Sequence, residues 1–152
     1  MSTLDFKAIR HLMSRGRASW AELAGILGLS APAAAERVRK LEERGVIRGY
    51  TALVDPEAIG IGITAFVAVS LERPEHRSAF LALVLRLPEV QECHHTAGED
   101  DYLLKLRCRG THDLERLVSE ELKGLPGVRR TRTTIALSTI KETPELPIYL
   151  DA

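Results

Sequence analysis

The spacing of hydrophobic residues changes part-way along the chain, from a helical repeat to a strand-like one. Near the N-terminus, Leu4, Ala8 and Leu12 recur at every fourth position, which is typical of one face of a helix. From about residue 62 onwards, short runs of β-branched and aliphatic residues alternate with helical patterns. In a chain of 152 residues, this change predicts two small domains. We place them at residues 1–54 and 62–138, with a linker over 55–61 and a C-terminal tail over 139–152.

The first domain is predicted to contain three helices followed by a β-hairpin. Ser19 and Ser30 are expected to cap the second and third helices, because a serine hydroxyl accepts a hydrogen bond from the first helical turn. Gly28 permits a tight turn between these helices, and the third helix is expected to run to Arg44 and to be stopped by Gly45. Residues 46–54 combine β-branched and aromatic residues with a central glycine, which indicates a hairpin and then a strand. This order predicts a winged helix-turn-helix.

The second domain reads as strand, helix, strand, strand, helix, strand. The expected strands cover 64–71, 90–96, 102–108 and 128–138, and the helices lie near 80–87 and 111–124, the second capped by Thr111. This order predicts an α+β fold of the ferredoxin-like βαββαβ type. Right-handed crossovers put both helices on one face of a four-stranded sheet. The other face is uncovered, so self-association is expected.

Charge is unevenly distributed along the chain. Lys plus Arg and Asp plus Glu both total 21, but residues 1–52 hold nine basic and five acidic side chains. In the third predicted helix, Arg37, Lys40 and Arg44 form a cationic stripe beside a separate apolar one. In a winged helix-turn-helix this helix enters the major groove of DNA. We predict contacts to double-stranded DNA from Ser30, Ala33, Glu36, Arg37, Lys40, Arg44 and Arg48.

The cations have two roles in this prediction, and one alternative stands beside it. Arg37 is expected to reach a guanine edge, whereas the other cations neutralise phosphates. The alanine-rich start of the third helix makes base contacts few, so DNA shape is expected to contribute. The alternative is that these cations form an ordinary solvated face and that the winged helix binds protein.

Several motifs resemble those of one protein family. In the first half they are Leu23-Ala24, Gly28-Leu29-Ser30 and the stretches 37–42 and 45–50; in the second they are 98–105, 125–128 and 131–135. In this order they resemble the feast/famine (Lrp/AsnC, leucine-responsive) transcriptional regulators over nearly the whole chain. The resemblance implies a sequence-specific regulator that dimerises through its sheets and often assembles to tetramers or octamers. It also implies an amino acid or related small effector, bound between dimers.

The resemblance assigns the effector site to one loop, made of Gly98, Glu99, Asp100, Asp101 and Tyr102. A glycine permits close backbone approach, and a carboxylate can bind an ammonium group. Many members have another residue where this chain has Asp100, and the added acid favours a cationic ligand such as lysine or arginine. The alternative is a plain hairpin turn with solvated acidic side chains.

Other chemistry has less support. Cys93, His94 and His95 alternate between the faces of a strand, so they cannot converge on one metal ion. The sequence contains no nucleophile-and-base signature, phosphate-binding glycine loop or dinucleotide fingerprint. We therefore predict no enzyme activity and no cofactor. A sirohaem decarboxylase, which shares this fold plan, is the alternative, with His94, His95 and Arg107 around the tetrapyrrole; the cationic helix argues against it.

The expected location is the cytoplasm. No apolar run approaches the roughly 20 residues of a membrane span, and the N-terminus has no secretory pattern. Two cysteines are too few for a disulfide framework. We expect no membrane partner.

Overall fold

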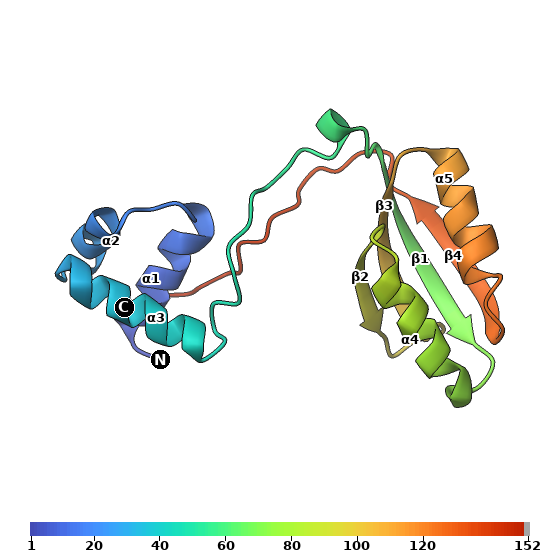
Figure 1. Ribbon diagram of the computed structural model, residues 1–152, viewed down its shortest axis with the longest axis horizontal. Helices are drawn as coiled ribbons and strands as arrows, with labels where there is room; N and C mark the ends of the chain where they lie inside the picture. Colours follow the sequence, from blue (N-terminus) through green and yellow to red (C-terminus); the bar gives the residue numbers. More distant parts are fainter. Residues whose placement is uncertain (151–152) are drawn as a thin grey trace. The chain divides into compact units, whose positions relative to one another are not determined.

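A computed structural model describes residues 1–150 of the protein. They form two compact units: Met1–Leu53 together with the chain from Ile140 onwards, and Val54–Thr139. The first consists of helices and the second of helices packed on a sheet (Figure 1). Each unit contains its own cluster of buried apolar side chains. The α+β fold class predicted from the sequence is confirmed.

Three helices form the first unit: α1 (Thr3–Ser14), α2 (Trp20–Leu27) and α3 (Ala31–Glu43). Each begins after a serine whose hydroxyl accepts a backbone N–H from the first turn: Ser2, Ser19 and Ser30. Both caps predicted from the sequence are therefore confirmed. Pro32 lies in the first turn of α3, where its missing N–H has no intrahelical partner to lose.

A short turn over residues 28–30 connects α2 to α3. Gly28 ends α2 with a left-handed backbone (φ 67°), a conformation that glycine adopts without steric cost, and its N–H donates to the carbonyl of Ala24. The three helices share a core of buried side chains: Ala8, Leu23, Ala24, Leu27, Ala34 and Val38. The turn and this core hold α2 and α3 in the helix-turn-helix arrangement that the sequence predicts.

The predicted hairpin and strand over residues 46–54 are wrong. Within the described chain, no strand forms between α3 and β1 (Ile63–Leu71). Val46 and Ile47 instead complete the end of α3, because both of their N–H groups donate to the carbonyl of Leu41, at 2.9 and 3.2 Å. Only residues 48–54 of the predicted region then remain, and an isolated two-stranded hairpin is marginal in water.

The second unit contains a four-stranded antiparallel sheet in the order β2-β3-β1-β4, as a ferredoxin-like fold requires. Its strands are β1, β2 (Val90–His95), β3 (Tyr102–Cys108) and β4 (Val128–Ile135). The helices are α4 (Arg77–Arg86), preceded by the short η2 (Pro74–His76), and α5 (Thr111–Glu115). Helix α5 continues as the π-helical segment η3 (Arg116–Leu122), and η1 (Glu57–Ile59) precedes β1. Helices α4 and α5 lie on the same face of the sheet (Figure 1).

Several element boundaries differ from the prediction, and two of these differences have a local explanation. Gly110, and not Thr111, occupies the position before α5, and no side chain caps that helix. Strand β4 ends at Ile135 instead of Ser138, because its partner β1 begins at Ile63. The last bond between them runs from the N–H of Ala136 to the carbonyl of Thr64, at 2.9 Å.

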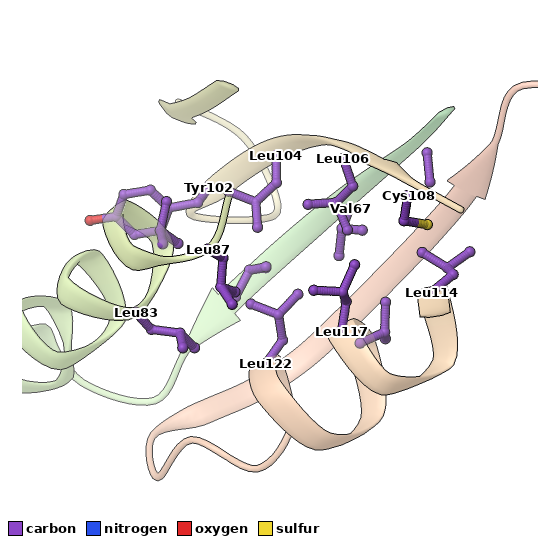
Figure 2. Packing of buried hydrophobic residues seen from close by; sticks show 14 of the residues in the cluster. Val67, Leu83, Leu87, Tyr102, Leu104, Leu106, Cys108, Leu114, Leu117 and Leu122 are labelled. Atoms are coloured by element: carbon purple, nitrogen blue, oxygen red, sulfur yellow. The ribbon is translucent and has the colours of Figure 1, made fainter. Parts of the chain in front are cut away.

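The core of the second unit lies between the sheet and its two helices. Alternate residues of β1 and β3, such as Val67 and Leu104, are fully buried on this side. Figure 2 shows Leu83 and Leu87 reaching this layer from the α4 side, and Leu117 and Leu122 from η3. The opposite face of the sheet carries no helix. None of the helices in residues 1–150 is long and apolar enough to cross a membrane.

Candidate nucleic-acid interface and effector loop

The exposed side of α3 carries most of the residues predicted to contact DNA. Ala33, Glu36 and Lys40 are exposed along it, and Arg44 is exposed at its C-terminal end. Among the described residues, no salt bridge involves Lys40 or Arg44. The hydroxyl of Ser30 accepts a hydrogen bond from the N–H of Ala33 at 3.2 Å, so this side chain caps α3. Arg48 is exposed in the irregular segment after α3.

Arg37 is held against α1. Its Nη1 donates to Asp5 Oδ1 at 2.8 Å and to Ser2 Oγ at 3.0 Å. Its side chain is 30% exposed, and within residues 1–150 its buried Nε has no hydrogen-bond partner. The expectation that all three cations project from one exposed face is therefore wrong for Arg37. A partly buried carboxylate is costly without a partner, and the Arg37 guanidinium supplies one.

Asp5 is the partner that the sequence analysis missed. Its Oδ2 accepts the N–H of Ser2 at 2.9 Å, which completes a capping box at the start of α1. The Ser2 N–H and the Arg37 guanidinium hold the pKa of Asp5 below its usual value. The Ser-x-x-Asp spacing is visible in the sequence, but its contact with a residue 32 positions away is not.

Replacing Asp5 with Ala is expected to lower the free energy of unfolding of the first unit by about 1–3 kcal/mol. The change removes a cap and leaves a partly buried guanidinium unpaired. Trp20 is the single tryptophan and belongs to α2, so its fluorescence during urea unfolding reports on this unit. The exposed Glu75 in the other unit provides the control, Glu75→Ala. Identical unfolding curves for wild type and Asp5→Ala would contradict a stabilising role for the contacts of Asp5 with Ser2 and Arg37.

Arg39 is a further exposed residue of α3 that the sequence analysis left out. It forms ion pairs with Glu36 and Glu43, three and four positions away, which is the spacing of neighbours on a helix surface. The hydrogen bond from Arg39 lowers the pKa of Glu36. The Glu36 carboxylate, predicted to contact DNA, is therefore already engaged by a neighbouring cation.

The predicted effector loop is the β2–β3 connection, Thr96–Asp101, which is tied down at its base. The N–H of Thr96 donates to the carbonyl of Asp101 at 2.9 Å. Asp101 also bonds to β1: its N–H donates to the carbonyl of Val69 at 2.9 Å, and its Oδ2 accepts the N–H of Leu71 at 2.7 Å. The exposed tip of the loop consists of Ala97, Gly98 and Glu99.

Asp100 is buried, and its carboxylate is engaged within the subunit. Its Oδ1 accepts from Ser70 Oγ at 2.8 Å and from Arg130 Nη2 at 3.1 Å, while Oδ2 accepts from Arg132. The Ser70 hydroxyl and the Arg132 guanidinium lower the pKa of Asp100 to about 2. The expectation that Asp100 offers a free carboxylate to an ammonium group is therefore wrong. The preference for a cationic effector loses its basis, because two arginines of β4 already balance this charge.

A cavity of about 290 Å³ lies beside the base of the loop. Two predicted effector residues, Asp101 and Tyr102, line it together with three residues that the sequence analysis did not assign to the effector site: Arg73, Arg77 and His95. These three come from the start of α4, the segment before it and the end of β2. These residues reach the loop only when the sheet is folded, so no local sequence motif predicts that they belong to this cavity.

Tyr102 is part of the core as well as of this cavity. It is 3% exposed, and its ring centroid lies 4.8 Å from that of Phe80 and 4.9 Å from that of His95. The predicted effector set is therefore divided: Asp101 and Tyr102 line the cavity, Gly98 and Glu99 form the exposed tip, and Asp100 anchors the loop.

Acid unfolding is expected to depend on Asp100. Its pKa is about 2 in the folded chain and about 4 in an unfolded one, so its stabilisation is complete above about pH 4 and lost as the pH falls towards 2. Asp100→Asn is expected to flatten this fall. Part of the pH dependence should remain in this variant, because the pKa of Asp113 is also about 2. Circular dichroism melts at stepped pH test this, with the exposed neighbour variant Glu99→Gln as control. Matching pH profiles for wild type and Asp100→Asn would contradict the role of Asp100.

The Cys93-His94-His95 run has local partners. His94 Nε2 lies 2.9 Å from Glu92 Oε1, and His95 stacks on Tyr102. Burial raises the pKa of the Cys93 thiol. Across residues 1–150, no group of three His, Cys, Asp or Glu side chains is arranged to hold a metal ion.

Comparisons with known proteins match both units. Residues 1–48 match the winged helix-turn-helix DNA-binding domain, and residues 64–146 match the Lrp/AsnC ligand binding domain. The leucine-responsive regulatory protein of Salmonella typhimurium is 39% identical to this chain, over 97% of this chain and 92% of its own length. That of Escherichia coli K12 is 38% identical with the same coverage. The chain belongs to the Lrp/AsnC family.

Solved structures of the Lrp/AsnC family have the same fold. A transcriptional regulator of Neisseria meningitidis in complex with L-Met superposes with a TM-score of 0.92 at 32% identity, covering 97% of this chain and 96% of that one. A feast or famine regulatory protein of M. tuberculosis complexed with L-methionine gives 0.85 at 39% identity, covering 91% and 93%. This Lrp/AsnC chain is a transcriptional regulator and not an enzyme, so the sirohaem decarboxylase alternative is not supported.

Proposed function

We propose that this regulator works as a homo-oligomer whose assembly or DNA affinity responds to an amino acid bound beside the loop 96–101. The observation that carries the proposal is the cavity that Asp101, Tyr102, Arg73 and Arg77 line, in a chain that also carries a helix-turn-helix. Residues 1–54 would contact DNA, 55–61 would act as the linker, and 62–138 would pair subunits and bind the effector, with 139–152 as the tail.

In this proposal the DNA contacts divide by position on α3. Lys40 and Arg44, with Arg48 beyond the helix, neutralise phosphates. Ser30, Ala33 and Glu36 face the bases from the first two turns. Arg37 sets the position of α3 through its bonds to α1, and any direct contact with DNA would require it to share or leave Asp5.

Self-association is proposed through the sheet face that carries no helix. Phe66 of β1 and Leu103 of β3 are large apolar residues on this face, 38% and 39% exposed. Pairing two such faces would remove this apolar surface from water. It would also join two helix-turn-helix units, so that the second DNA contact becomes intramolecular. Tetramers or octamers built from such dimers belong to the same proposal.

An effector with a carboxylate and an uncharged side chain suits the cavity. Arg73 and Arg77 can donate to a carboxylate, and the aromatic ring of Tyr102 offers an apolar contact. The two L-methionine complexes among similar structures support an effector of this class.

No cofactor is required for this role. A regulator that binds chromosomal DNA has to reach it, which supports a cytoplasmic location.

The loop is connected to the proposed dimer face through Asp100. Its partners Ser70 and Arg130 are opposite each other in the β1–β4 register, and Arg132 is opposite Ala68 on the same face. A ligand that moves the loop would therefore also move two arginines on the surface through which subunits are proposed to pair. This connection supports a link between effector binding and assembly.

Mass measurement in solution, with and without L-methionine or L-leucine, tests the assembly and the effector together. We expect a dimer or larger species whose mass or thermal midpoint shifts with one of these amino acids. Arg77→Ala is expected to remove the shift, whereas the control Arg86→Ala, at the far end of α4, leaves it intact. A single subunit at working concentration, with no affinity for duplex DNA in dilute buffer, would overturn the proposal.

A further inference from the structure

We propose that this chain has a second small-molecule site, for a zwitterionic amino acid with an apolar side chain. The site is a cavity of about 410 Å³, within the range of small-ligand sites. We call it the linker cavity, and its main lining residues are Pro56, Ile59, Ile61, Pro88, Glu89 and Arg109. Residues on both sides of η1 form one wall, and the start of β2 and the end of β3 form the other.

The linker cavity is separate from the loop 96–101. It contacts β3 at Arg107 and Cys108, the last two residues of the strand, whereas the loop joins β3 at Tyr102. At about 3.3 Å per residue, these two ends of the strand are roughly 20 Å apart. Occupation of one site is therefore measurable without occupation of the other.

The linker side of the cavity is apolar and open to water. Ile59 is 66% exposed and Val54 is 57% exposed, although both line the cavity. Pro56 and Ile61 extend this wall, and Pro88 faces it from the β2 side. An aliphatic side chain placed here would remove apolar surface from water on several sides, which favours binding. The wall therefore suits the side chain of an amino acid such as leucine.

Glu89 provides the acidic end of the cavity. Its Oε1 accepts from Arg116 Nη2 at 3.0 Å, but its Oε2 is buried and, among the described residues, has no hydrogen-bond partner. A buried carboxylate oxygen without a donor is unfavourable, and such groups in folded proteins nearly always have a partner. An ammonium group carries three donors and a complementary charge, so the α-amino group of a ligand would supply what Glu89 lacks.

Arg109 provides the basic end. It is 75% exposed, and its Nε and Nη2 lie 3.4 Å from the carboxylate oxygens of Asp113. These bonds are long for a charge-assisted pair, which is typically about 2.7–2.9 Å. Asp113 is also bonded to Arg116 at 2.9 Å. Arg109 thus retains donor capacity for a carboxylate, and its planar guanidinium suits two-point binding. A carboxylate, an ammonium group and an apolar side chain on one small molecule describe an apolar α-amino acid.

A ligand in this cavity would contact the linker directly. Val54 and Ile59 belong to the segment through which the chain leaves the first unit, so a ligand packed on them would restrict the conformations of that segment. The site adds to the function proposed for the loop and does not depend on it.

Photo-crosslinking of the full-length protein tests the site. Photo-leucine, the diazirine analogue of L-leucine, is expected to label peptides that contain residues 54–61 or 88–91. Excess L-leucine should abolish this labelling. Two analogues should not abolish the labelling: isopentylamine, which lacks the carboxylate, and 4-methylpentanoate, which lacks the ammonium group. Labelling confined to the cavity beside the loop, at residues 71–77, 95 and 101–102, would overturn the second site, and so would no labelling. Either result leaves the function proposed for the loop to its own test.

Two variants and a matched control assign the charged ends. Glu89→Gln and Arg109→Gln are each expected to reduce labelling of the linker peptides at least about tenfold. Labelling of the cavity beside the loop, at residues 71–77, 95 and 101–102, should be unchanged. The control Arg86→Gln replaces another exposed arginine that lies near an acidic residue, Glu121 of η3, and should have no effect. Thermal melts confirm that each variant is folded. Full labelling of the linker in both variants would overturn the assignment.

Discussion

Replacing both Lys40 and Arg44 with Ala is expected to weaken binding to duplex DNA at least about tenfold. Both side chains are exposed on or beside α3, and no described salt bridge holds either of them. Each lost phosphate contact lowers the steepness of log Kd against log salt by about one. In a dimer, where each replacement occurs twice, the slope should fall by about four. Fluorescence anisotropy of a labelled duplex across a salt series measures both quantities.

Arg86→Ala is the matched control for this loss of charge. Arg86 is 71% exposed at the end of α4 in the other unit, so its removal changes the net charge without touching the helix-turn-helix. We expect its salt slope to match that of wild type. If the double variant bound with wild-type affinity and slope, α3 would be excluded as the DNA-contacting helix.

Replacing Gly127 with Ala is expected to lower the free energy of unfolding of the second unit by about 2–5 kcal/mol. Gly127 has φ 94°, which L side chains rarely adopt, and an added Cβ would lie 2.1 Å from the ring of His76. The strained backbone and the forced movement of a packed ring both add to the cost. Far-UV circular dichroism during urea unfolding measures the change.

Gly98→Ala is the control that separates these effects from a general cost of losing a glycine. Gly98 does not have a positive φ, and nothing lies within 4 Å of an added Cβ. We expect this variant to unfold within about 0.5 kcal/mol of wild type, as is usual for surface changes. Similar losses in the two variants would contradict the steric role assigned to His76.

Features that depend on local chemistry were predictable from the sequence. The serine caps of α2 and α3 require only a hydroxyl and a nearby N–H. The strands of the second unit follow from their runs of β-branched and aliphatic residues. The hairpin after α3 was mispredicted because β-branched residues such as Val46 favour strands, yet its N–H was needed to end a helix.

The candidate sites were harder to predict, because their key contacts join residues distant in sequence. A helical projection places Arg37 beside Lys40, but it cannot show that Asp5 on another helix draws Arg37 away. Likewise, nothing around Asp100 in the sequence indicates that Arg130 and Arg132, about 30 residues later, balance its charge. Ion pairs of this kind depend on tertiary structure. A count of the charged residues in the sequence does not show which of them are paired.

The C-terminal segment has a consequence for chain entropy. From Ile140 the chain rejoins the first unit, where the N–H of Leu146 lies 3.3 Å from the sulfur of Met13. The DNA-binding unit is therefore attached to its neighbour by two lengths of polypeptide, one before β1 and one after β4. Because both connections must span from one unit to the other, each closes a loop with the other, and the entropy of the two segments is lower than that of two free chains.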